Sequence, residues 1–247
     1  LGAEHFNKHA QFRVSIMYLD GYGTEIDIAE SNRWLIKAYN LPVYEESPKW
    51  IHEEIKKELA YRYYWGIGVE NSLEKAKEFD LGYALETLGK IAIDEKDDMT
   101  MLSIAIDYEN IAENYKKAKY WYKKSAQIGN LEATKTLADI YRFDLDYKNA
   151  EFWYLRAIAQ NDIESMEDLA FIYASDEESP GIKNTRYNPD KAFELLVRAK
   201  NEGSTTYHYD LSYLYKYGLG VDKDIKKSIY LLQEMLKLPN LNRNDKE

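Results

Sequence analysis

The sequence predicts an all-α protein built from about six consecutive helical hairpins, and three observations support this fold class. Glycine and proline are scarce, with 12 and 5 of the 247 residues, together about 7% where about 12% is average. A turn-rich β-sandwich or barrel would need more of both. Hydrophobic residues make up 45% and charged residues 31%, as in a folded chain. Finally, one side-chain pattern with helical spacing recurs six times.

This recurring pattern marks the second helix of each hairpin. A small residue is followed by bulky residues three and four positions later and usually by a small residue at position seven, as in Ala150, Trp153, Tyr154 and Ala157. These offsets place all four residues on one helical face. The small residues let a neighbouring helix approach, and the bulky pair fills the remaining space. The six copies begin at Ser31, Ala76, Ala118, Ala150, Ala192 and Ser228.

A second signature marks the first helix of each hairpin and ends in tyrosine. The tyrosines are Tyr18, Tyr63, Tyr108, Tyr141, Tyr173 and Tyr215. We expect the last five to be mostly buried, and we expect no β-sheet. Three of the units continue with Gly-x-Gly, beginning at Gly21, Gly66 and Gly218. Each of these glycines follows its tyrosine by three residues, where a left-handed helix cap is expected.

The two signatures divide a single domain, residues 1–247, into six repeats. The repeats are expected at residues 9–41, 47–86, 98–130, 131–162, 163–203 and 204–238, with a polar tail at 239–247.

The repeats differ from one another at their ends and turns. Ser47 and Pro48 have the residue types of a helix cap and a first-turn proline, and they should open the second repeat. Residues 86–99 are expected to lengthen that repeat's second helix past Tyr83 and to end in an acidic loop. The fourth repeat lacks the glycine turn, the fifth carries an insertion from Ser175 to Pro189, and Pro239 should end the last helix.

The turn sequences Tyr63–Val69 and Tyr215–Val221, and the helix sequence Lys119–Asn130, resemble the SEL-one-like repeat family, a relative of the tetratricopeptide repeat. The resemblance extends over nearly the whole chain. It implies an α-solenoid whose hairpins stack into a curved superhelix, with the first helices lining the concave face.

Charge and cysteine content exclude several functional classes. The chain has 33 basic and 43 acidic residues, a net charge of −10, whereas nucleic acids and anionic membranes are bound by basic faces. No apolar run is long enough for a transmembrane helix, and the first ten residues show no signal-peptide core. Because cysteine is absent, disulfides, thiolate nucleophiles and cysteine-bound metals are excluded. This favours the cytoplasm over the periplasm or secretion.

No motif predicts an enzyme, a cofactor or a metal site. The Gly-x-Gly turns lack the third glycine of a dinucleotide fingerprint and follow helices instead of strands. His5 and His9 have the spacing of two metal ligands on one helix, but Glu4 is the nearest acid, so we expect an incidental pair. His52 and His208 have no local triad partners.

Aromatic side chains predict a protein-binding face. The chain has 23 tyrosines, more than the repeat core requires. Residues two positions before the signature tyrosines form a row on the first helices: Ile16, Tyr61, Ile106, Asp139, Phe171 and Tyr213. Either this row is exposed for recognition or it packs between repeats. Our candidate partner-binding residues are Tyr61, Tyr64, Trp65, Asp139, Arg142, Phe171, Tyr213 and Lys216. The insertion Ser175–Pro189 is the second choice.

The resemblance implies a non-enzymatic scaffold, because family members act as quality-control adaptors, bacterial host-interaction factors and signalling scaffolds. We expect the partner to be a protein with a basic surface, and we expect no nucleic-acid binding and no membrane insertion. Ile229, Tyr230 and Leu236 lack an obvious neighbour in the last helix, which predicts self-association there. A narrower hypothesis is a bacterial immunity or inhibitor protein that neutralises a toxin. The alternatives are an accessory ligand-binding protein, cell-wall-associated or a quality-control adaptor, and, third, a hydrolase.

Overall fold

The computed structural model describes residues 7–42, 49–179 and 182–238. These residues form helices apart from one small two-stranded sheet, so the predicted all-α fold class is confirmed. The chain divides into two compact units, Leu1–Ala118 and Lys119–Glu247. The boundary between them falls inside helix α7 (Tyr115–Ile128).

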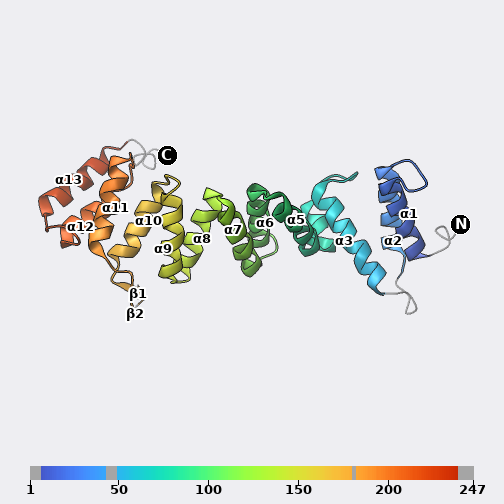
Figure 1. The fold of residues 1–247 in the computed structure, drawn as a ribbon, viewed down its shortest axis with the longest axis horizontal. Coiled ribbons are helices and arrows are strands. Elements are labelled where there is room, and N and C mark those ends of the chain that lie inside the picture. The colour runs from blue at the N-terminus through green and yellow to red at the C-terminus, as the bar shows by residue number, and fades with distance from the viewer. Residues whose placement is uncertain (1–6, 43–48, 180–181, 239–247) are drawn as a thin grey trace, which may run out of the picture. The chain divides into compact units, whose positions relative to one another are not determined.

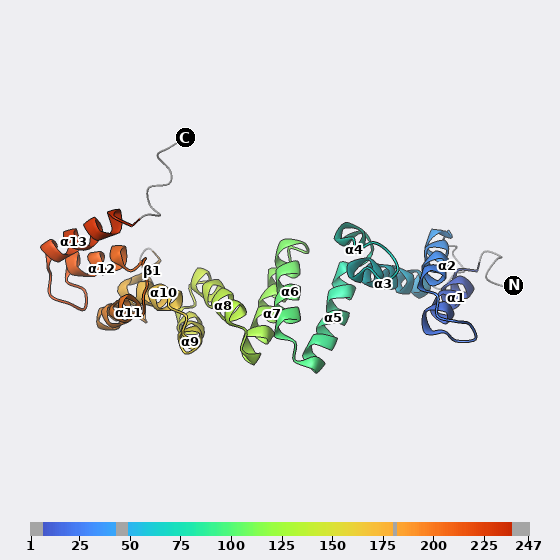
Figure 2. The same ribbon diagram turned by 90° about the horizontal axis from the view of Figure 1, so that it is seen from above.

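The first unit contains three packed pairs of helices (Figures 1 and 2). Helix α1 packs against α2, α3 against α4, and α5 against α6, while α3 also contacts α5. The bounds are α1 Lys8–Asp20, α2 Ile28–Asn40, α3 Lys49–Trp65, α4 Leu73–Phe79, α5 Leu81–Glu95 and α6 Asp98–Asn110.

The second unit continues the hairpin pattern, and its consecutive helices lie side by side in both views (Figures 1 and 2). The pairs are α8 with α9, α10 with α11, and α12 with α13, and α9 also packs against α10. The bounds are α8 Leu131–Phe143, α9 Tyr147–Ile158, α10 Glu164–Ala174, β1 Glu177–Ser179, β2 Ile182–Lys183, α11 Pro189–Asn201, α12 His208–Tyr217 and α13 Ile225–Leu236.

Most helices begin directly after a short polar residue whose side chain accepts a hydrogen bond from a backbone N–H three positions on. These caps satisfy donors that the helix itself leaves unpaired. The capping residues are Asn7, Asp27, Ser72, Asp80, Asp97, Asn114, Asn130, Asp146, Asn188 and Asp224.

The small residues that begin the second-helix pattern lie in the packed interior of the hairpins. All six are buried: Ser31, Ala76, Ala118, Ala150, Ala192 and Ser228. Trp121 and Trp153 are buried beside them. The sequence pattern therefore identified the buried small residue that begins each copy.

The Gly-x-Gly turns need glycine at both positions. Gly218 ends α12 with a φ of 73°, in the left-handed region that favours glycine. Gly220 also has a positive φ, 65°, and a Cβ there would overlap the backbone of Pro189 at the start of α11. Gly68 similarly faces Ile28 of α2. The first glycine thus turns the chain, and at Gly68 and Gly220 the second glycine allows the chain to approach the preceding hairpin.

The expectation of a longer second helix in the second repeat is wrong. Helix α4 ends at Phe79, and Asp80 has φ −165° and ψ 75°, outside the helical region. The Asp80 side chain then accepts a hydrogen bond from Tyr83 N (3.0 Å) and starts α5. Lys96, at φ 55°, ends α5, and Asp97 caps α6, so a tight turn replaces the expected acidic loop.

The insertion after α10 forms the one sheet in the described residues, which corrects the expectation of no sheet. Strands β1 and β2 pair in antiparallel fashion, with Glu177 opposite Lys183. Buried Asn184 fixes the base of this hairpin, because its Nδ2 donates to the carbonyl oxygens of Ile172 (2.7 Å) and Ser175 (2.8 Å). The unfavourable burial of an amide is offset by these hydrogen bonds.

The signature tyrosines divide into two groups. Tyr108, Tyr173 and Tyr215 are buried, as expected. Tyr63 and Tyr141 are partly buried and keep more exposed surface than the other three. A lysine Nζ lies over each of these rings, Lys75 at 4.8 Å from the centroid of Tyr63 and Lys119 at 4.0 Å from that of Tyr141. Lysine Nζ atoms also lie over the buried rings of Tyr108, Tyr173 and Tyr215, at 5.2, 5.5 and 4.4 Å from their centroids, so this contact is common to all five tyrosines.

A buried arginine connects three helices of the first unit. Arg62 of α3 is 1% exposed and donates to Glu58 Oε1 (2.8 Å), Ser31 Oγ (2.9 Å) and Asn32 Oδ1 (2.7 Å). Ser31 Oγ donates in turn to the carbonyl oxygen of Ser15 in α1 (2.5 Å). This polar network lies where the sequence pattern predicts apolar packing.

Three predicted features lie outside the described residues. They are the cap at Ser47 and Pro48, the helix stop at Pro239 and the polar tail at 239–247.

Candidate partner-binding face

None of the six side chains predicted to form a row on the first helices is buried. Ile106, Phe171 and Tyr213 are exposed by 40%, 53% and 44%. Ile16, Tyr61 and Asp139 are half-buried. Three of the six positions are therefore accessible to a partner, and the other three are partly covered by neighbouring residues.

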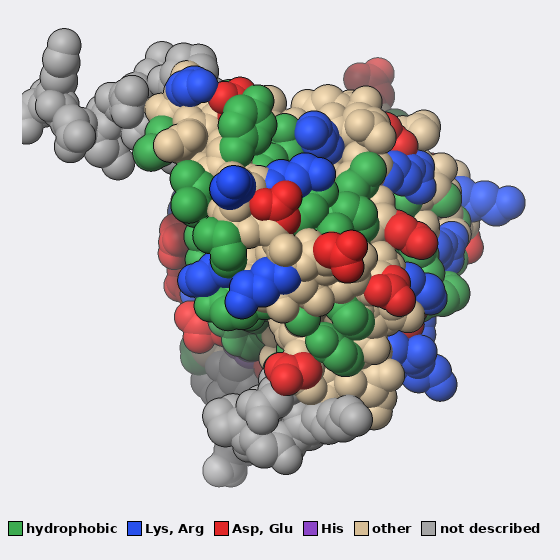
Figure 3. Space-filling model, turned by 90° about the vertical axis from the view of Figure 1, so that its left-hand side faces the viewer, with side chains coloured by type: hydrophobic (Ala, Val, Ile, Leu, Met, Phe, Trp, Pro, Cys, Tyr) green, Lys and Arg blue, Asp and Glu red, His purple; other side chains and the backbone are tan. Residues whose placement is uncertain are grey.

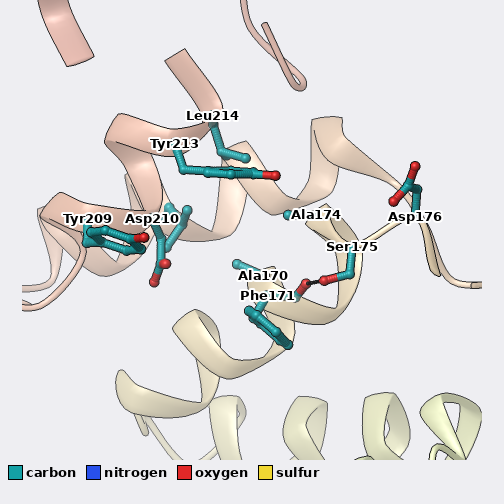
Figure 4. Close-up of a pocket in the computed structure, with 10 residues that line it drawn as sticks. Ala170, Phe171, Ala174, Ser175, Asp176, Tyr209, Asp210, Tyr213 and Leu214 are labelled. Carbon is teal, nitrogen blue, oxygen red and sulfur yellow. Dashed lines mark hydrogen bonds between the residues drawn. The ribbon is translucent and has the colours of Figure 1, made fainter. Parts of the chain in front are cut away.

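In the second unit, residues of α10 and α12 enclose a cavity of about 430 Å³. Figure 4 shows Phe171 on the α10 side, Tyr213 on the α12 side, and Ala170 and Ala174 between them. Tyr209 and Asp210 lie at one end, and Ser175 and Asp176 at the other. The volume is within the range of small-molecule pockets, about 300–1,000 Å³.

A second hollow of about 560 Å³ adjoins this cavity and shares Phe171 and Asp210 with it. It joins Arg142 of α8 to acidic residues of α10 and to the turn before α12. Its other lining residues are Ile163, Glu164, Glu167, Asp168, Gly203, Ser204, Thr205 and Thr206. We call the surface around the two hollows the α8/α10/α12 face, and it comprises Asp139, Arg142, Glu164, Glu167, Asp168, Phe171, Tyr209, Asp210 and Tyr213.

Arg142 and Asp139 are held by each other and by Tyr154 of α9. Arg142 Nη2 lies 3.2 Å from Asp139 Oδ1, and Arg142 Nε donates to Tyr154 Oη (3.0 Å). Tyr154 Oη donates to the same Asp139 oxygen (2.5 Å). Burial and the hydrogen bond to Asp139 raise the pKa of Tyr154 above its ordinary value. Asp139 and Arg142, both predicted binding residues, therefore form an ion pair whose charges cancel and whose orientation is fixed by Tyr154.

The carboxylates of Asp168 and Asp210 beside this pair are less fully compensated, although Arg142 and Lys135 partly offset the negative charge around Asp168. Burial, followed by the charge of Asp139, raises the pKa of Asp168 to about 6. Burial and the charge of Glu167 raise the pKa of Asp210. Within the described residues, no basic side chain forms an ion pair with either group. Glu167 accepts hydrogen bonds from the hydroxyl groups of Ser204 and Thr206, which carry no charge. The face therefore has an excess of negative charge.

Tyr61, Tyr64 and Trp65 lie together on α3 of the first unit. Trp65 is 45% exposed, and its ring packs edge-to-face with those of Tyr61 (6.5 Å) and Tyr64 (5.8 Å). Tyr64 Oη donates to Asp107 Oδ2 of α6 (2.6 Å). Trp65 lines two hollows, of about 420 and 430 Å³. Tyr64 thus contributes to packing within the unit, while Trp65 is accessible.

The structure adds residues that sequence reasoning missed. Tyr217 packs against Tyr213, with ring centroids 4.6 Å apart, and the predicted residue Lys216 lies over the Tyr217 ring at 4.9 Å. Tyr209, Asp210 and Asp168 line the two hollows. Tyr209, Tyr213 and Tyr217 are spaced by four residues on α12, so helical periodicity could have identified them.

The last helix exposes the side chains that the sequence left without neighbours. Ile229, Tyr230 and Leu236 of α13 are exposed by 51%, 56% and 69%. Figure 3 shows hydrophobic side chains interspersed with charged ones at this end of the second unit. Self-association through α13 stays a prediction.

Neither a membrane-spanning helix nor a metal-binding cluster occurs in the described part of the chain. None of its helices is long and apolar enough to cross a bilayer. The described histidine, aspartate and glutamate side chains form no group of three that could hold a metal ion.

Comparison with known proteins identifies the repeats. The chain matches the Sel1 repeat at residues 8–42, 58–79, 107–130, 140–162, 163–204 and 207–240. These six matches confirm the resemblance and the number of repeats. No curated protein sequence matches the chain.

Several solved structures are similar to the chain. A protective antigen of uropathogenic Escherichia coli with an SLR fold is 24% identical over 94% of this chain and 46% of its own, with a TM-score of 0.47. The chain thus spans less than half of that antigen. A Sel1 repeat protein from Oxalobacter formigenes is 23% identical over 95% and 87% (TM-score 0.45). An immunity protein from Pseudomonas aeruginosa is 18% identical over 97% and 88% (TM-score 0.39).

Proposed function

The chain belongs to the Sel1 repeat family, and from this premise we propose that it is a non-enzymatic scaffold that binds another protein through the α8/α10/α12 face. One observation carries the proposal. Phe171 and Tyr213 expose aromatic rings beside carboxylates that have no ion-pair partner in the described residues. Aromatic side chains are enriched at protein interfaces because they provide a large contact area at low entropic cost.

The surplus of carboxylates on this face supports a partner with a basic surface. Burial raises the pKa values of Asp168 and Asp210, and the negative charges of Asp139 and Glu167 raise them further. A partner lysine or arginine would supply compensating positive charge. Electrostatic complementarity of this kind selects partners and accelerates their encounter.

Alanine substitution tests the proposal on a partner captured from the native cell. Phe171→Ala and Tyr213→Ala should each weaken binding by about 2 kcal/mol or more, as expected for central aromatic residues of an interface. Phe152→Ala is the matched control, because Phe152 on α9 is 52% exposed and Phe171 is 53% exposed. Binding should be measured by calorimetry, with thermal unfolding of each variant alongside.

The proposal fails if Phe171→Ala and Tyr213→Ala bind the partner as the parent does. It also fails if Phe152→Ala weakens binding as much as they do, because the contact would then lie on the second helices.

A narrower form of the proposal is that the chain is an immunity or inhibitor protein whose partner is a toxin. The net charge of −10 supports an acidic protein that covers a basic surface. Growth of cells that produce the captured partner, with and without this chain, tests it. If the partner does not impair growth in either case, the narrower form is wrong and only the scaffold function stands.

A further inference from the structure

We propose that the cavity between α10 and α12 receives an arginine side chain of the partner protein. This inference rests on the proposed function, because it specifies what that partner presents to the face.

The walls of the cavity suit a flat cation on a flexible apolar stem. Phe171 and Tyr213 provide aromatic rings on its two sides (Figure 4). Ala170 and Ala174 provide apolar surface between the rings, and Leu214 adds apolar surface next to Tyr213. The methylene stem of an arginine would bury against the aliphatic side chains while its guanidinium lies against a ring. Such cation–π contacts are a common use of exposed aromatic side chains.

The charge of the lining selects a cation. The charged residues among those lining the cavity are Asp176 and Asp210, and both are acidic. Asp210 also borders the second hollow, where Glu164, Glu167 and Asp168 add negative charge. Arg142 is the basic residue that lines that hollow, and its charge is already paired with Asp139.

The combination of a carboxylate and aromatic walls favours arginine over lysine. The guanidinium group is planar, stacks on aromatic rings and offers a fork of donors that matches a carboxylate. A lysine ammonium is a more strongly hydrated point charge, so it loses more on leaving water. The cavity of about 430 Å³ is larger than one side chain, which leaves room for residues next to the arginine.

Titration of the full chain with short neutral-ended peptides tests the inference without the partner. The probe is acetyl-Gly-Gly-Arg-Gly-Gly-amide, followed by amide nitrogen–proton NMR. The matched peptide carries citrulline, which keeps the shape of arginine but has no charge. The arginine peptide should shift the amides of α10 and α12 and bind about tenfold more tightly than the citrulline peptide, as expected for one charge-assisted hydrogen bond. A lysine peptide should bind with intermediate affinity.

Asp210→Asn should remove most of the preference for arginine over citrulline. This variant is expected to fold, because Asp210 already has a raised pKa and Asn carries no charge to bury. Glu194→Gln removes an exposed charge from α11 and is the control for net charge; it should leave the preference intact. Phe171→Ala should weaken binding of the arginine peptide about threefold to tenfold through loss of the ring contact.

The inference is overturned if arginine and citrulline peptides bind equally, if the shifted amides lie outside α10 and α12, or if Asp210→Asn keeps the preference. Failure of the proposed function would look different. In that case the arginine peptide binds at α10 and α12 as expected, but Phe171→Ala and Tyr213→Ala retain the captured partner. Conversely, loss of the partner in those variants together with equal binding of the two peptides refutes the arginine site alone.

Discussion

Asp168 and Asp210 illustrate how single residues on the α8/α10/α12 face combine stability and recognition. Both lie partly out of water and near other acids, and the pKa of each is raised. A carboxylate in this position destabilises the folded chain while it is ionised. A cation of the proposed partner would offset this cost on binding.

The effect of Asp168 on stability depends on pH. Its pKa of about 6 in the folded chain lies above the ordinary value of 3.8. The folded chain therefore binds more protons than the unfolded chain between these values, and stability falls as pH rises through this range. Asp168→Asn should remove this loss and be more stable than the parent at pH 7.5, by about 1–2 kcal/mol after allowance for solvent screening.

Urea unfolding followed by circular dichroism measures the difference. The advantage of Asp168→Asn should disappear near pH 4, where the parent carboxyl is also neutral. Glu194→Gln, on an exposed site, should show no pH-dependent difference from the parent. If Asp168→Asn has the same stability as the parent at both pH values, the Asp168 carboxylate is fully solvated.

At the scale of elements, the glycine turns connect local backbone conformation to the packing of successive hairpins. Gly220 combines a positive φ with close approach to the backbone of Pro189. Gly203, with φ 97°, has a positive φ as well, but a Cβ at that position would meet open space. A comparison of substitutions at the two positions therefore separates the cost of backbone strain from the cost of steric overlap with α11.

Gly220→Ala should destabilise the chain more than Gly203→Ala does. Both variants incur about 1–2 kcal/mol of left-handed strain. Gly220→Ala also pushes a methyl group into the start of α11, which adds about 1–3 kcal/mol of overpacking. The free energies of unfolding of the two variants, obtained by chemical denaturation, test this difference. Equal losses would mean that the turn moves away from α11 at little cost.

Sequence periodicity predicted the elements that depend on local spacing. The second-helix pattern and the glycine turns have signals within one or two helical turns; the glycine turns were correct, and the pattern failed only in the second repeat, where it crosses Asp80. The break at Asp80 was missed because one residue both ends α4 and caps α5, which hydrophobic spacing does not reveal. The Arg62 network was missed because its partners Ser31 and Asn32 come from a different helix.

The candidate site was predicted only in part, for a related reason. Exposure of Phe171 and Tyr213 follows from helix register relative to the buried Tyr173 and Tyr215. The cavity, however, depends on how α10 and α12 pack, and this brings Asp210 beside Phe171 across 39 residues of chain. The orientation of the Asp139–Arg142 ion pair also depends on Tyr154, which comes from the next helix and forms a hydrogen bond with each residue.

At the scale of the whole molecule, the candidate residues fall into two separate units. Tyr61, Tyr64 and Trp65 belong to the first unit, and the α8/α10/α12 face belongs to the second. The net charge of −10 belongs to the entire chain. The partly buried carboxylates with raised pKa values, Asp168 and Asp210, lie in the second unit. We therefore assign the main contact to that unit.

Site-specific photo-crosslinking in the native cell shows whether the α8/α10/α12 face contacts another protein. p-Benzoylphenylalanine replaces either Phe171 on the α8/α10/α12 face or Phe152 on α9, two positions of nearly equal exposure. The account predicts a discrete adduct with another protein at position 171 that loss of Asp210 weakens, and none at position 152. A discrete adduct at position 152 with none at position 171 would contradict the account.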